Sequence, residues 1–484
     1  MQTGLNVRNP LQAISSSSMG GSHAQNGSFK DPSGTVFLSD GELYRQVNLG
    51  YRQEYSQLME SGLYARLTSE GLLIPHEEVQ VLPFEKTKSL LILKPLKVPF
   101  VSYPFEWCFG QLQAAALATL KIQKIAMEFG MTLKDASAYN IQFHRGRPVL
   151  IDTLSFQVYT WGAPWTAYRQ FCQHFLAPLM LMAKVDITLG RLMRVYLDGI
   201  PLDVASAMLP WRTFFCLPAF IHIHLHGWAQ KSRHKWVSPP NGNDSKTLSK
   251  NVSKNQLAGI IESLEDVIRD LKLNVKKSVW ADYYAETNYS PSAFKHKQEV
   301  VKYLLEKTAP GVVWDLGANT GLFSRMASDA GIPTLAFDMD PLAVQCNWIQ
   351  LLEKKEPDLL PLVMDFGNPT PGIGWENSER DSLFARANAD TVMALALVHH
   401  LAITLNLPFG HIARFMARLA KHVIIEFIPK TDSQVIGMLA SREDIFSEYR
   451  EQEFEIAFAK SFTLVEKIAL RDSQRIVYLF KRNP

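Results

Sequence analysis

Strand-like and helix-like segments alternate through the second half of this 484-residue chain. Apolar runs predict strands at 312–316, 334–338, 359–365, 391–397 and 422–428, and helical spacing follows at 322–330, 342–354 and 409–421. Two alternating segments, 462–470 and 475–481, predict a terminal hairpin. Because parallel strands need crossover connections, this order predicts an α/β fold, a doubly wound and mostly parallel seven-stranded sheet covered by helices.

A glycine-containing turn joins the first of these strands to its helix, in the sequence Asp315-Leu316-Gly317-Ala318-Asn319-Thr320-Gly321. Glycine lets the backbone approach a ligand closely, and the N–H groups that begin the next helix bind anionic groups. Asp338 ends the second strand, where a carboxylate accepts hydrogen bonds from ribose hydroxyls. Asp365 ends the third, where a side chain reaches the exocyclic amine of an adenine. These spacings predict a nucleoside site.

With these motifs, residues from about 280 to 484 resemble a class I S-adenosylmethionine-dependent methyltransferase. Asp315, Gly317 and Gly321 match the first motif of that family, with Asn319 in place of its middle glycine. The resemblance implies S-adenosylmethionine as the cofactor. It implies that Asp315 and Gly317 lie at the methionine part, Asp338 at the ribose, and Asp365 with Phe366 at the adenine. Ala318, Asn319, Gly321 and Met339 are also expected to bind the cofactor. A dinucleotide-binding Rossmann domain is the competing interpretation of the turn, but Asn319 breaks its G-x-G-x-x-G pattern.

Upstream of the turn, Lys297 or Tyr289 is expected near the methionine carboxylate, or else as a packing residue of a surface helix. After the fourth strand, His399 and His400 are the predicted catalytic residues, because a neutral imidazole can deprotonate a hydroxyl acceptor. The alternative is that they only form hydrogen bonds within helix packing. Glu426 ends the fifth strand and is a further pocket-facing residue. Residues 441–444 are expected to begin a helix.

In the N-terminal half, Asp135 is followed five residues later by Asn140, and Asp152 follows a predicted hairpin over 141–151. This spacing is similar to the catalytic segment of kinase-like phosphotransferases, in which an Asp is the base and an Asn and a second Asp bind metal. The resemblance covers about residues 33–230 and implies an α+β kinase-like domain. It implies a hairpin at 35–47 with Arg45 where the phosphate-binding Lys stands, a helix at 51–71 and a strand at 89–93.

This half departs from the kinase pattern in several ways. It has no glycine-rich phosphate loop, Arg45 replaces the Lys, no His precedes Asp135, and Thr-Leu follows Asp152. Three interpretations stay open: ordinary turn residues, a degenerate kinase-like module that binds substrate or partner, and an active phosphotransferase, which would make a bifunctional kinase–methyltransferase. His222, His224 and His226 would share one face of a strand and could bind metal, but their surroundings favour a helix, so no metal site is predicted.

Composition divides the chain and limits its partners. Residues 1–32 are expected to be a disordered tail, 33–237 a kinase-like or acceptor-recognition domain, 238–255 a linker and 256–484 the methyltransferase domain. The net charge of +3 argues against nucleic acid and favours a small-molecule, glycan or lipid-linked acceptor. Four scattered cysteines, with no signal peptide and no membrane span, predict a cytoplasmic protein. The sequence does not predict an oligomeric state.

Overall fold

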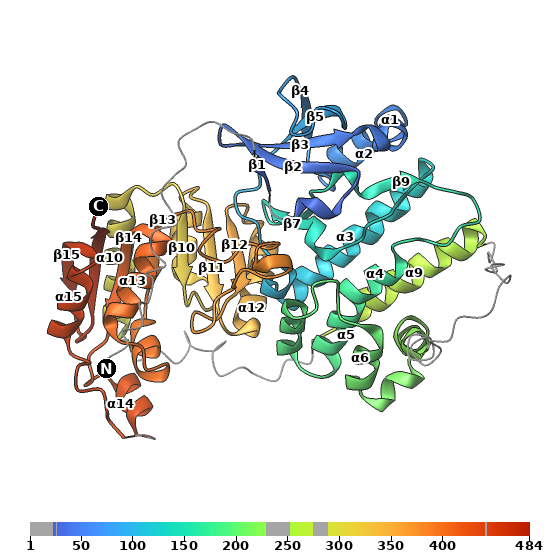
Figure 1. The fold of residues 1–484 in the computed structure, drawn as a ribbon. Coiled ribbons are helices and arrows are strands. Elements are labelled where there is room, and N and C mark those ends of the chain that lie inside the picture. The colour runs from blue at the N-terminus through green and yellow to red at the C-terminus, as the bar shows by residue number, and fades with distance from the viewer. Residues whose placement is uncertain (1–22, 26, 229–251, 274–288, 441–442) are drawn as a thin grey trace, which may run out of the picture. The chain divides into compact units, whose positions relative to one another are not determined.

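The computed structural model describes residues 23–25, 27–228, 252–273, 289–440 and 443–484 (Figure 1). The predicted tail up to residue 22 and the predicted linker positions 238–251 lie outside the described residues. The chain divides into two compact units. The first extends to Gln53 and includes Pro75–Lys97, and the second comprises Glu54–Ile74 and Val98–Pro484.

The first unit is built on an antiparallel sheet in the strand order β1–β2–β3–β5–β4. Its strands are β1 (His23–Ala24), β2 (Gly34–Ser39), β3 (Glu42–Asn48), β4 (His76–Val79) and β5 (Ser89–Pro95). β2 and β3 form the hairpin predicted at 35–47, and its turn residues Asp40 and Gly41 adopt positive φ angles. Pairing of β1 with β2 starts the sheet before residue 33, where the sequence placed the start of the first domain.

The N-terminal part of the second unit surrounds the long helix α3 (Phe109–Glu128). β6 (Met131–Leu133) pairs with β9 (Phe156–Val158), and β7 (Ile141–His144) pairs with β8 (Arg147–Leu150) as the hairpin predicted after Asn140. The helices before residue 271, with η marking 3₁₀ or π turns, include α1 (Arg52–Glu60), α2 (Leu63–Ser69), η4 (Pro104–Glu106), η5 (Ala138–Asn140), η6 (Thr153–Ser155), α4 (Tyr168–Phe171), η7 (Cys172–Leu176), α5 (Ala177–Lys184), η8 (Ile187–Arg194), α6 (Leu202–Met208), η9 (Trp211–Phe215), α7 (Leu217–Ala219), η10 (Phe220–Leu225) and α9 (Lys254–Asp270).

The C-terminal part contains a seven-stranded sheet in the order β12–β11–β10–β13–β14–β16–β15, coloured yellow to red in Figure 1. Its strands are β10 (Val313–Leu316), β11 (Thr334–Asp338), β12 (Leu359–Val363), β13 (Ala389–Ala394), β14 (Ala420–Phe427), β15 (Phe462–Ala469) and β16 (Ile476–Arg482). β10 to β14 are parallel, and β16 lies antiparallel between β14 and β15. The predicted sheet and its terminal hairpin are therefore confirmed.

Both faces of this sheet are covered by helices. Successive residues of a strand point to opposite faces, so neighbouring residues show what packs on each face. Val313 and Met393 pack in one hydrophobic cluster with residues of α10 and α11. Their neighbours Trp314 and Val392 pack in another, with residues of α13 and α15. The helices of this part include α10 (Pro291–Thr308), α11 (Leu322–Ser328), α12 (Pro341–Lys354), η12 (His400–Thr404), α13 (Phe409–Leu419), α14 (Ser433–Leu439) and α15 (Glu451–Ala459). The sheet is thus doubly wound.

Helix α9 follows the predicted linker, at the position where the sequence placed the start of the methyltransferase domain. In the structure it packs along α3 of the N-terminal part. Gln113 donates from Nε2 to the carbonyl oxygens of Ile268 (2.7 Å) and Leu271 (3.0 Å), and Lys124 forms an ion pair with Glu265. The N-terminal part therefore continues to the end of α9.

The N-terminal and C-terminal parts of the second unit share one hydrophobic core. Trp348 of α12 lies edge-on to Phe143 of β7, with ring centroids 5.2 Å apart. The backbone at Gly110 approaches so closely that a β-carbon there would lie 2.7 Å from the Trp348 ring. Its N–H donates to Gln345 Oε1 at 2.7 Å. The two parts are packed together and not merely tethered.

The same interface buries an ion pair between Glu106 of η4 and Arg386. Arg386 donates from Nη1 and Nη2 to the two carboxylate oxygens at 2.9 and 2.5 Å, and Thr370 Oγ1 donates to the carboxylate at 2.6 Å. The guanidinium carbon lies 4.2 Å from the centroid of the Tyr103 ring. The Glu106 and Arg386 side chains are only 1% and 5% exposed, so each charge is balanced by its partner and not by water.

One prediction concerns a region outside the sheet. Residues 441–444 were expected to begin a helix, but 443–450 are not helical and α15 begins at Glu451. Ser441 and Arg442 lie outside the described residues. The prediction was wrong because Asp444 Oδ1 accepts the N–H of Phe446 in a turn, and both its oxygens bind Lys430. Within the described ranges, no helix is long and apolar enough to cross a bilayer.

We expect Glu106→Gln to lower the free energy of unfolding by about 3–5 kcal/mol, because it leaves the Arg386 charge buried without a counter-charge. Glu70→Gln is the matched control, since Glu70 pairs with Lys121 and Arg66 at the protein surface, where water screens the charges, and it should lower the free energy of unfolding far less. Urea unfolding followed by circular dichroism measures both. An equal loss of unfolding free energy in the two variants would contradict an interface ion pair that is shielded from water.

Candidate functional site

The turn after β10 has an unusual backbone. Gly317, Asn319 and Gly321 adopt positive φ angles of 77°, 50° and 82°. A β-carbon at Gly321 would lie 2.5 Å from Asn347 Nδ2 and 2.7 Å from Arg325 Nη1, so only glycine fits there. Arg325 in turn donates from Nη1 to the carbonyl oxygen of Thr320 at 2.7 Å and holds the turn against α11.

Asp315, at the end of β10, is 2% exposed. Its Oδ2 accepts a hydrogen bond from Ser324 Oγ at 2.7 Å. Burial raises the pKa of Asp315 to about 7, against the opposing effect of the Ser324 hydrogen bond. A carboxylate whose pKa is shifted this far, at the end of a strand, marks a candidate ligand site.

Asp338, at the end of β11, faces the same turn. Its Oδ2 accepts the N–H of Asn319 at 2.8 Å, and its Oδ1 accepts the N–H of Asp340 at 2.9 Å. Burial raises the pKa of Asp338 to about 6, although both backbone hydrogen bonds lower it. A carboxylate offers about four lone-pair sites, so each oxygen keeps acceptor capacity for a ligand hydroxyl. The next residue, Met339, is 58% exposed.

The third carboxylate, Asp365, follows β12. Its Oδ1 accepts the N–H of Gly367 at 2.8 Å in a tight turn. Phe366 packs edge-on against Phe337 of β11 and Phe415 of α13. Because β12, β11 and β10 are adjacent parallel strands, Asp315, Asp338 and the Asp365 turn all lie at the carboxyl edge of the sheet, where α/β proteins bind ligands.

Lys297 of α10 lies beside this edge in a buried polar cluster. Its Nζ donates to Glu426 Oε2 at 2.7 Å and to the Tyr289 hydroxyl at 3.0 Å. Tyr289 in turn donates to Glu426 Oε1. Glu426 Oε2 also accepts the N–H of Ala396 at 2.8 Å, and Ala396 has a φ of 51°. The Glu426 carboxylate therefore fixes the chain that leads from β13 to the two histidines.

Arg475, just before β16, completes the cluster. It donates from Nε and Nη2 to the Asp432 carboxylate at 2.7 and 3.1 Å, and its guanidinium carbon lies 4.3 Å from the centroid of the Tyr289 ring. Burial works against ionisation of Glu426, but Lys297 and Arg475 hold the pKa of its carboxyl below the usual value. Sequence inspection missed Arg475, because its partners are distant in the sequence and no local motif marks it.

His399 and His400 follow this chain, with ring centroids 4.2 Å apart. His399 is 1% exposed, and its Nδ1 has no hydrogen-bond partner among the described residues. Burial, together with the positive charges of Arg475 and Lys297, lowers the pKa of His399 well below the usual value. His400 is partly exposed, and burial lowers its pKa as well. Both imidazoles are therefore neutral at physiological pH.

The N-terminal residues predicted from the kinase pattern lie on one short stretch of the structure. Asp135 Oδ1 accepts hydrogen bonds from Gln170 Nε2 (2.7 Å) and the N–H of Ser137 (2.9 Å). Asn140 Nδ2 donates to Ser155 Oγ at 3.2 Å, and that hydroxyl donates to Asp152 Oδ2 at 2.7 Å. Asn140 and Asp152 thus share one serine. Arg45, in the first unit, forms an ion pair with Asp31 at 2.8 Å.

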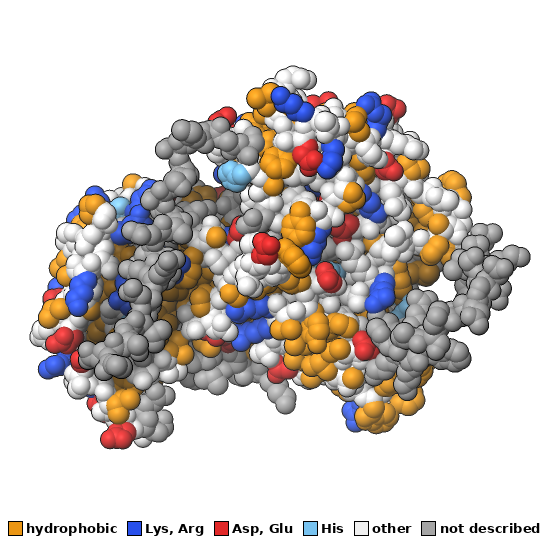
Figure 2. All heavy atoms as spheres, in the orientation of Figure 1, with side chains coloured by type: hydrophobic (Ala, Val, Ile, Leu, Met, Phe, Trp, Pro, Cys, Tyr) orange, Lys and Arg blue, Asp and Glu red, His pale blue; other side chains and the backbone are white. Residues whose placement is uncertain are grey.

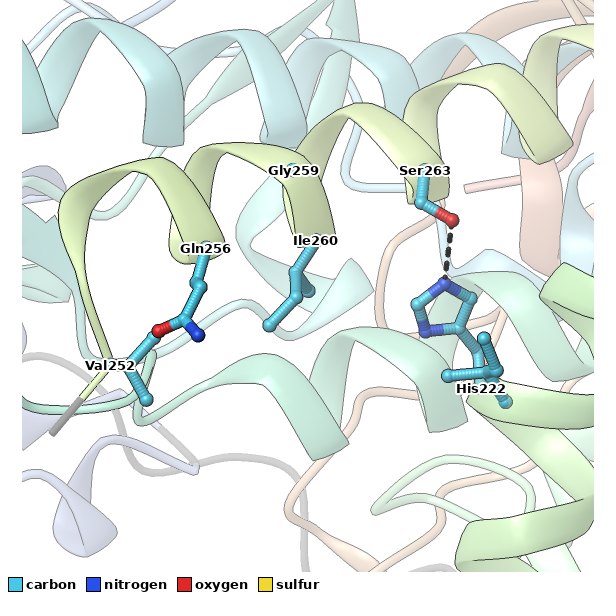
Figure 3. A pocket seen from close by; sticks show the side chains of 7 residues that line it. His222, Val252, Gln256, Gly259, Ile260 and Ser263 are labelled. Carbon is cyan, nitrogen blue, oxygen red and sulfur yellow. Dashed lines mark hydrogen bonds between the residues drawn. The ribbon is translucent and has the colours of Figure 1, made fainter. Parts of the chain in front are cut away.

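His222 and His224 lie in the helical turn η10, and His226 follows it in the next helical turn, so the helix that the sequence favoured is confirmed. The Tyr168 hydroxyl lies 2.7 Å from His222 Nδ1 and 3.3 Å from His226 Nε2. His222 Nε2 lies 3.1 Å from Ser263 Oγ (Figure 3). In the described part of the chain, no cluster of three or more His, Cys, Asp or Glu side chains is arranged to hold a metal ion.

A groove of about 660 Å³ opens beside this histidine, between η10 and α9 (Figure 3). Its lining is Ile221, His222, Val252, Gln256, Gly259, Ile260 and Ser263. None of the residues predicted to bind the cofactor lines it. The sheet edge, and not this groove, carries the chemistry that the sequence predicted.

The strand order, the antiparallel seventh strand, the glycine turn and the carboxylates at the strand ends are together those of the class I methyltransferase fold. The buried Asp315 carboxylate suits the positive charge of S-adenosylmethionine, and the Asp338 oxygens suit a ribose. The C-terminal part therefore has the fold of a class I S-adenosylmethionine-dependent methyltransferase, as the sequence resemblance implied. The kinase-like resemblance of the N-terminal half is not established in the same way.

Nodulation protein NoeA of Rhizobium meliloti (strain 1021) is 35% identical to this chain over 462 residues, which cover 94% of this chain and 96% of that protein. The chain belongs to the same family as NoeA. No protein-family model matches it.

Solved structures similar to this chain include methyltransferases. N-methyltransferase NodS from Bradyrhizobium japonicum WM9 is 12% identical, with a TM-score of 0.30 over 40% of this chain and 99% of that one. Magnesium protoporphyrin IX methyltransferase from Synechocystis PCC 6803 is 16% identical, with a TM-score of 0.30 over 42% and 93%. The bifunctional kinase-methyltransferase WbdD is 17% identical, with a TM-score of 0.29 over 41% of each chain.

We expect Asp315→Asn to stabilise the ligand-free protein at high pH. The folded carboxyl keeps its proton up to about pH 7, whereas the unfolded carboxyl loses it near pH 4. Rising pH therefore favours the unfolded wild type between these values, and asparagine removes that effect. The variant should be more stable by about 2–4 kcal/mol at pH 8 and indistinguishable at pH 4. Thermal unfolding at both pH values measures the difference, and a loss at both would contradict the raised pKa.

Proposed function

We propose that this methyltransferase transfers a methyl group from S-adenosylmethionine to a hydroxyl of a small molecule, glycan or lipid-linked intermediate. One observation carries the cofactor part of the proposal: two carboxylates, the buried Asp315 and the partly buried Asp338, end adjacent parallel strands beside a turn that requires glycine. When bound, the cofactor supplies a methyl group on a positively charged sulfur.

Each of the three parts of the cofactor, the methionine, the ribose and the adenine, has its own set of proposed contact residues. The residues at the methionine part are Asp315, Gly317, Ala318, Asn319, Gly321 and Lys297; those at the ribose are Asp338 and Met339; those at the adenine are Asp365 and Phe366. An ammonium group has three donors, and Lys297 gives two of them to Glu426 and Tyr289. The third donor remains for the methionine carboxylate in this proposal.

The acceptor class rests on charge. The chain carries a net charge of only +3, and basic and acidic side chains are interspersed over the face shown in Figure 2. A nucleic-acid partner would require a basic surface to neutralise phosphates. A neutral or weakly charged acceptor fits better.

His399 or His400 acts as the general base. Methyl transfer is an in-line displacement, so the enzyme must hold the acceptor oxygen in line with the methyl group and accept its proton. A neutral imidazole accepts that proton, and the lowered pKa of both histidines keeps them neutral at physiological pH. Glu426 positions them, because it holds the backbone at Ala396.

Cofactor binding is tested by calorimetric titration with S-adenosylhomocysteine. We expect wild-type binding and a loss of about tenfold to a hundredfold in Asp338→Ala, the effect of removing hydrogen bonds to a charged group. Asp390→Ala is the matched control, because that carboxylate lies at the opposite, amino end of β13 and pairs with Lys421. A folded wild type that does not bind would overturn the proposal.

The general base is tested by activity as a function of pH. The acceptor is first obtained by following tritiated methyl groups into fractionated cell extract. We expect His399→Gln or His400→Gln to lower kcat by about 10²–10⁴-fold. In the wild type, kcat should fall only at pH values below the range in which histidines ordinarily titrate, because burial lowers the pKa of both histidines. Unchanged kcat in both variants would exclude a histidine base.

A second candidate function is phosphotransfer by the N-terminal half, which would make the protein a bifunctional kinase–methyltransferase. The Ser155 hydroxyl that joins Asn140 to Asp152 favours it, since these are the two positions that bind metal in the kinase pattern. Mg-ATP should then raise the melting temperature of the full chain, and Asn140→Ala should abolish that rise. Absence of any rise would favour a module that only binds substrate or partner.

The cysteines bear on the location of the protein, and the packing of α9 bears on its domain division. None of the four cysteines is joined in a disulfide, which supports a cytoplasmic location. We assign 33–237 to the kinase-like or acceptor-recognition part and the sheet up to residue 484 to methyl transfer. We place α9 with the former because it packs along α3.

A further inference from the structure

Two arginines of the N-terminal half contact the loops at the proposed cofactor site. Both belong to η8. Arg191 donates from Nη2 to the carbonyl oxygen of Met339 at 2.9 Å. Arg194 donates from Nη1 to the Asn368 carbonyl oxygen at 3.2 Å, and from Nη2 to Asn368 Oδ1 at 3.2 Å and the Pro369 carbonyl oxygen at 3.3 Å.

These acceptors lie in the two loops proposed to bind the nucleoside. Met339 directly follows Asp338, at the proposed ribose contact. Asn368 closes the turn that begins at Asp365, since its N–H donates to the Asp365 carbonyl oxygen at 3.1 Å. The two arginines therefore hold the backbone of the loop proposed to bind the ribose and of the loop proposed to bind the adenine.

The η8 turn is itself firmly held. Asp186 caps it by accepting the N–H of Thr188 at 2.8 Å. Met193, which lies between the two arginines in the sequence, is fully buried. Its carbonyl oxygen accepts a hydrogen bond from the Tyr139 hydroxyl at 3.5 Å. Gly190 packs so closely on Met182 that a β-carbon would lie 3.0 Å from its sulfur. The arginines thus project from a fixed support.

We propose that Arg191 and Arg194 are positioning residues for the cofactor, through which the N-terminal half preorganises the nucleoside loops of the methyltransferase domain. This inference rests on the proposed cofactor site. Without the arginines, each loop has to be ordered when the cofactor binds, and that ordering lowers affinity. The N-terminal half is on this account a part of the cofactor site, in addition to any role in choosing the acceptor.

The test compares two ligands by calorimetry. S-adenosylhomocysteine contains both the nucleoside and the methionine part, whereas 5′-deoxy-5′-methylthioadenosine contains only the nucleoside. We expect Arg191→Ala with Arg194→Ala to weaken both ligands by the same factor, about fivefold to thirtyfold. Asp315→Asn should weaken only S-adenosylhomocysteine. A general loss of structure would also weaken both ligands, so the melting temperature of the double variant is measured as well and should equal that of the wild type.

Conservative variants add a readout that depends on geometry. Arg191 makes one described hydrogen bond to the ribose loop, so Arg191→Lys should retain most of the affinity. Arg194 uses both Nη atoms on three acceptors, so Arg194→Lys should not. Arg212→Ala is the matched control, because Arg212 is an exposed arginine of η9 in the same half, and it should bind both ligands as the wild type does.

The outcomes separate this inference from the proposed function. If the wild type binds neither ligand, the proposed cofactor site fails. If the wild type binds and the double variant binds equally well, with an unchanged melting temperature, the site stands and the positioning role fails. If the double variant loses affinity for S-adenosylhomocysteine alone, the arginines act on the methionine part, which also overturns the inference.

Discussion

At the end of β10 the Asp315 carboxylate is cut off from water and accepts a hydrogen bond from the neutral hydroxyl of Ser324. Burial of a charge is costly unless a counter-charge or a ligand compensates. The nearby cation, Lys297, already gives two donors to Glu426 and Tyr289. Under the proposed function, the positive charge of S-adenosylmethionine supplies that compensation.

Two buried ion pairs, Lys297–Glu426 and Glu106–Arg386, connect segments that are far apart in the sequence. Such pairs contribute little net stability, because desolvation offsets their attraction, but breaking one is expensive. Lys297–Glu426 joins α10 to β14 and, through Ala396, to the histidine segment. Glu106–Arg386 joins the N-terminal part to the methyltransferase domain. Both pairs therefore fix which segments lie together more than they add to the stability of the fold.

The N-terminal half and the methyltransferase domain are less separate than a linker would indicate. They share a hydrophobic core through Trp348 and Phe143, and α9 lies on α3 although it follows the linker in the sequence. The η8 arginines bring the N-terminal half to the nucleoside loops. We therefore expect substitutions in either half to change cofactor binding, even where the substituted residue does not contact the cofactor.

By itself, the sequence determined the doubly wound sheet, its terminal hairpin, the glycine turn and the carboxylates of Asp315, Asp338 and Asp365. Hydrophobic periodicity and turn residues are local signals, and parallel strands bring their carboxyl ends together whatever the details of packing. Only the tertiary structure decided the partners of Lys297, the roles of Arg475 and Glu426, the place of α9, and the contacts of Arg191 and Arg194. These depend on contacts between residues separated by tens to hundreds of positions, which no local pattern encodes. The helix expected at 441–444 failed for the same reason, since Asp444 pairs with Lys430 across a loop and does not cap a helix.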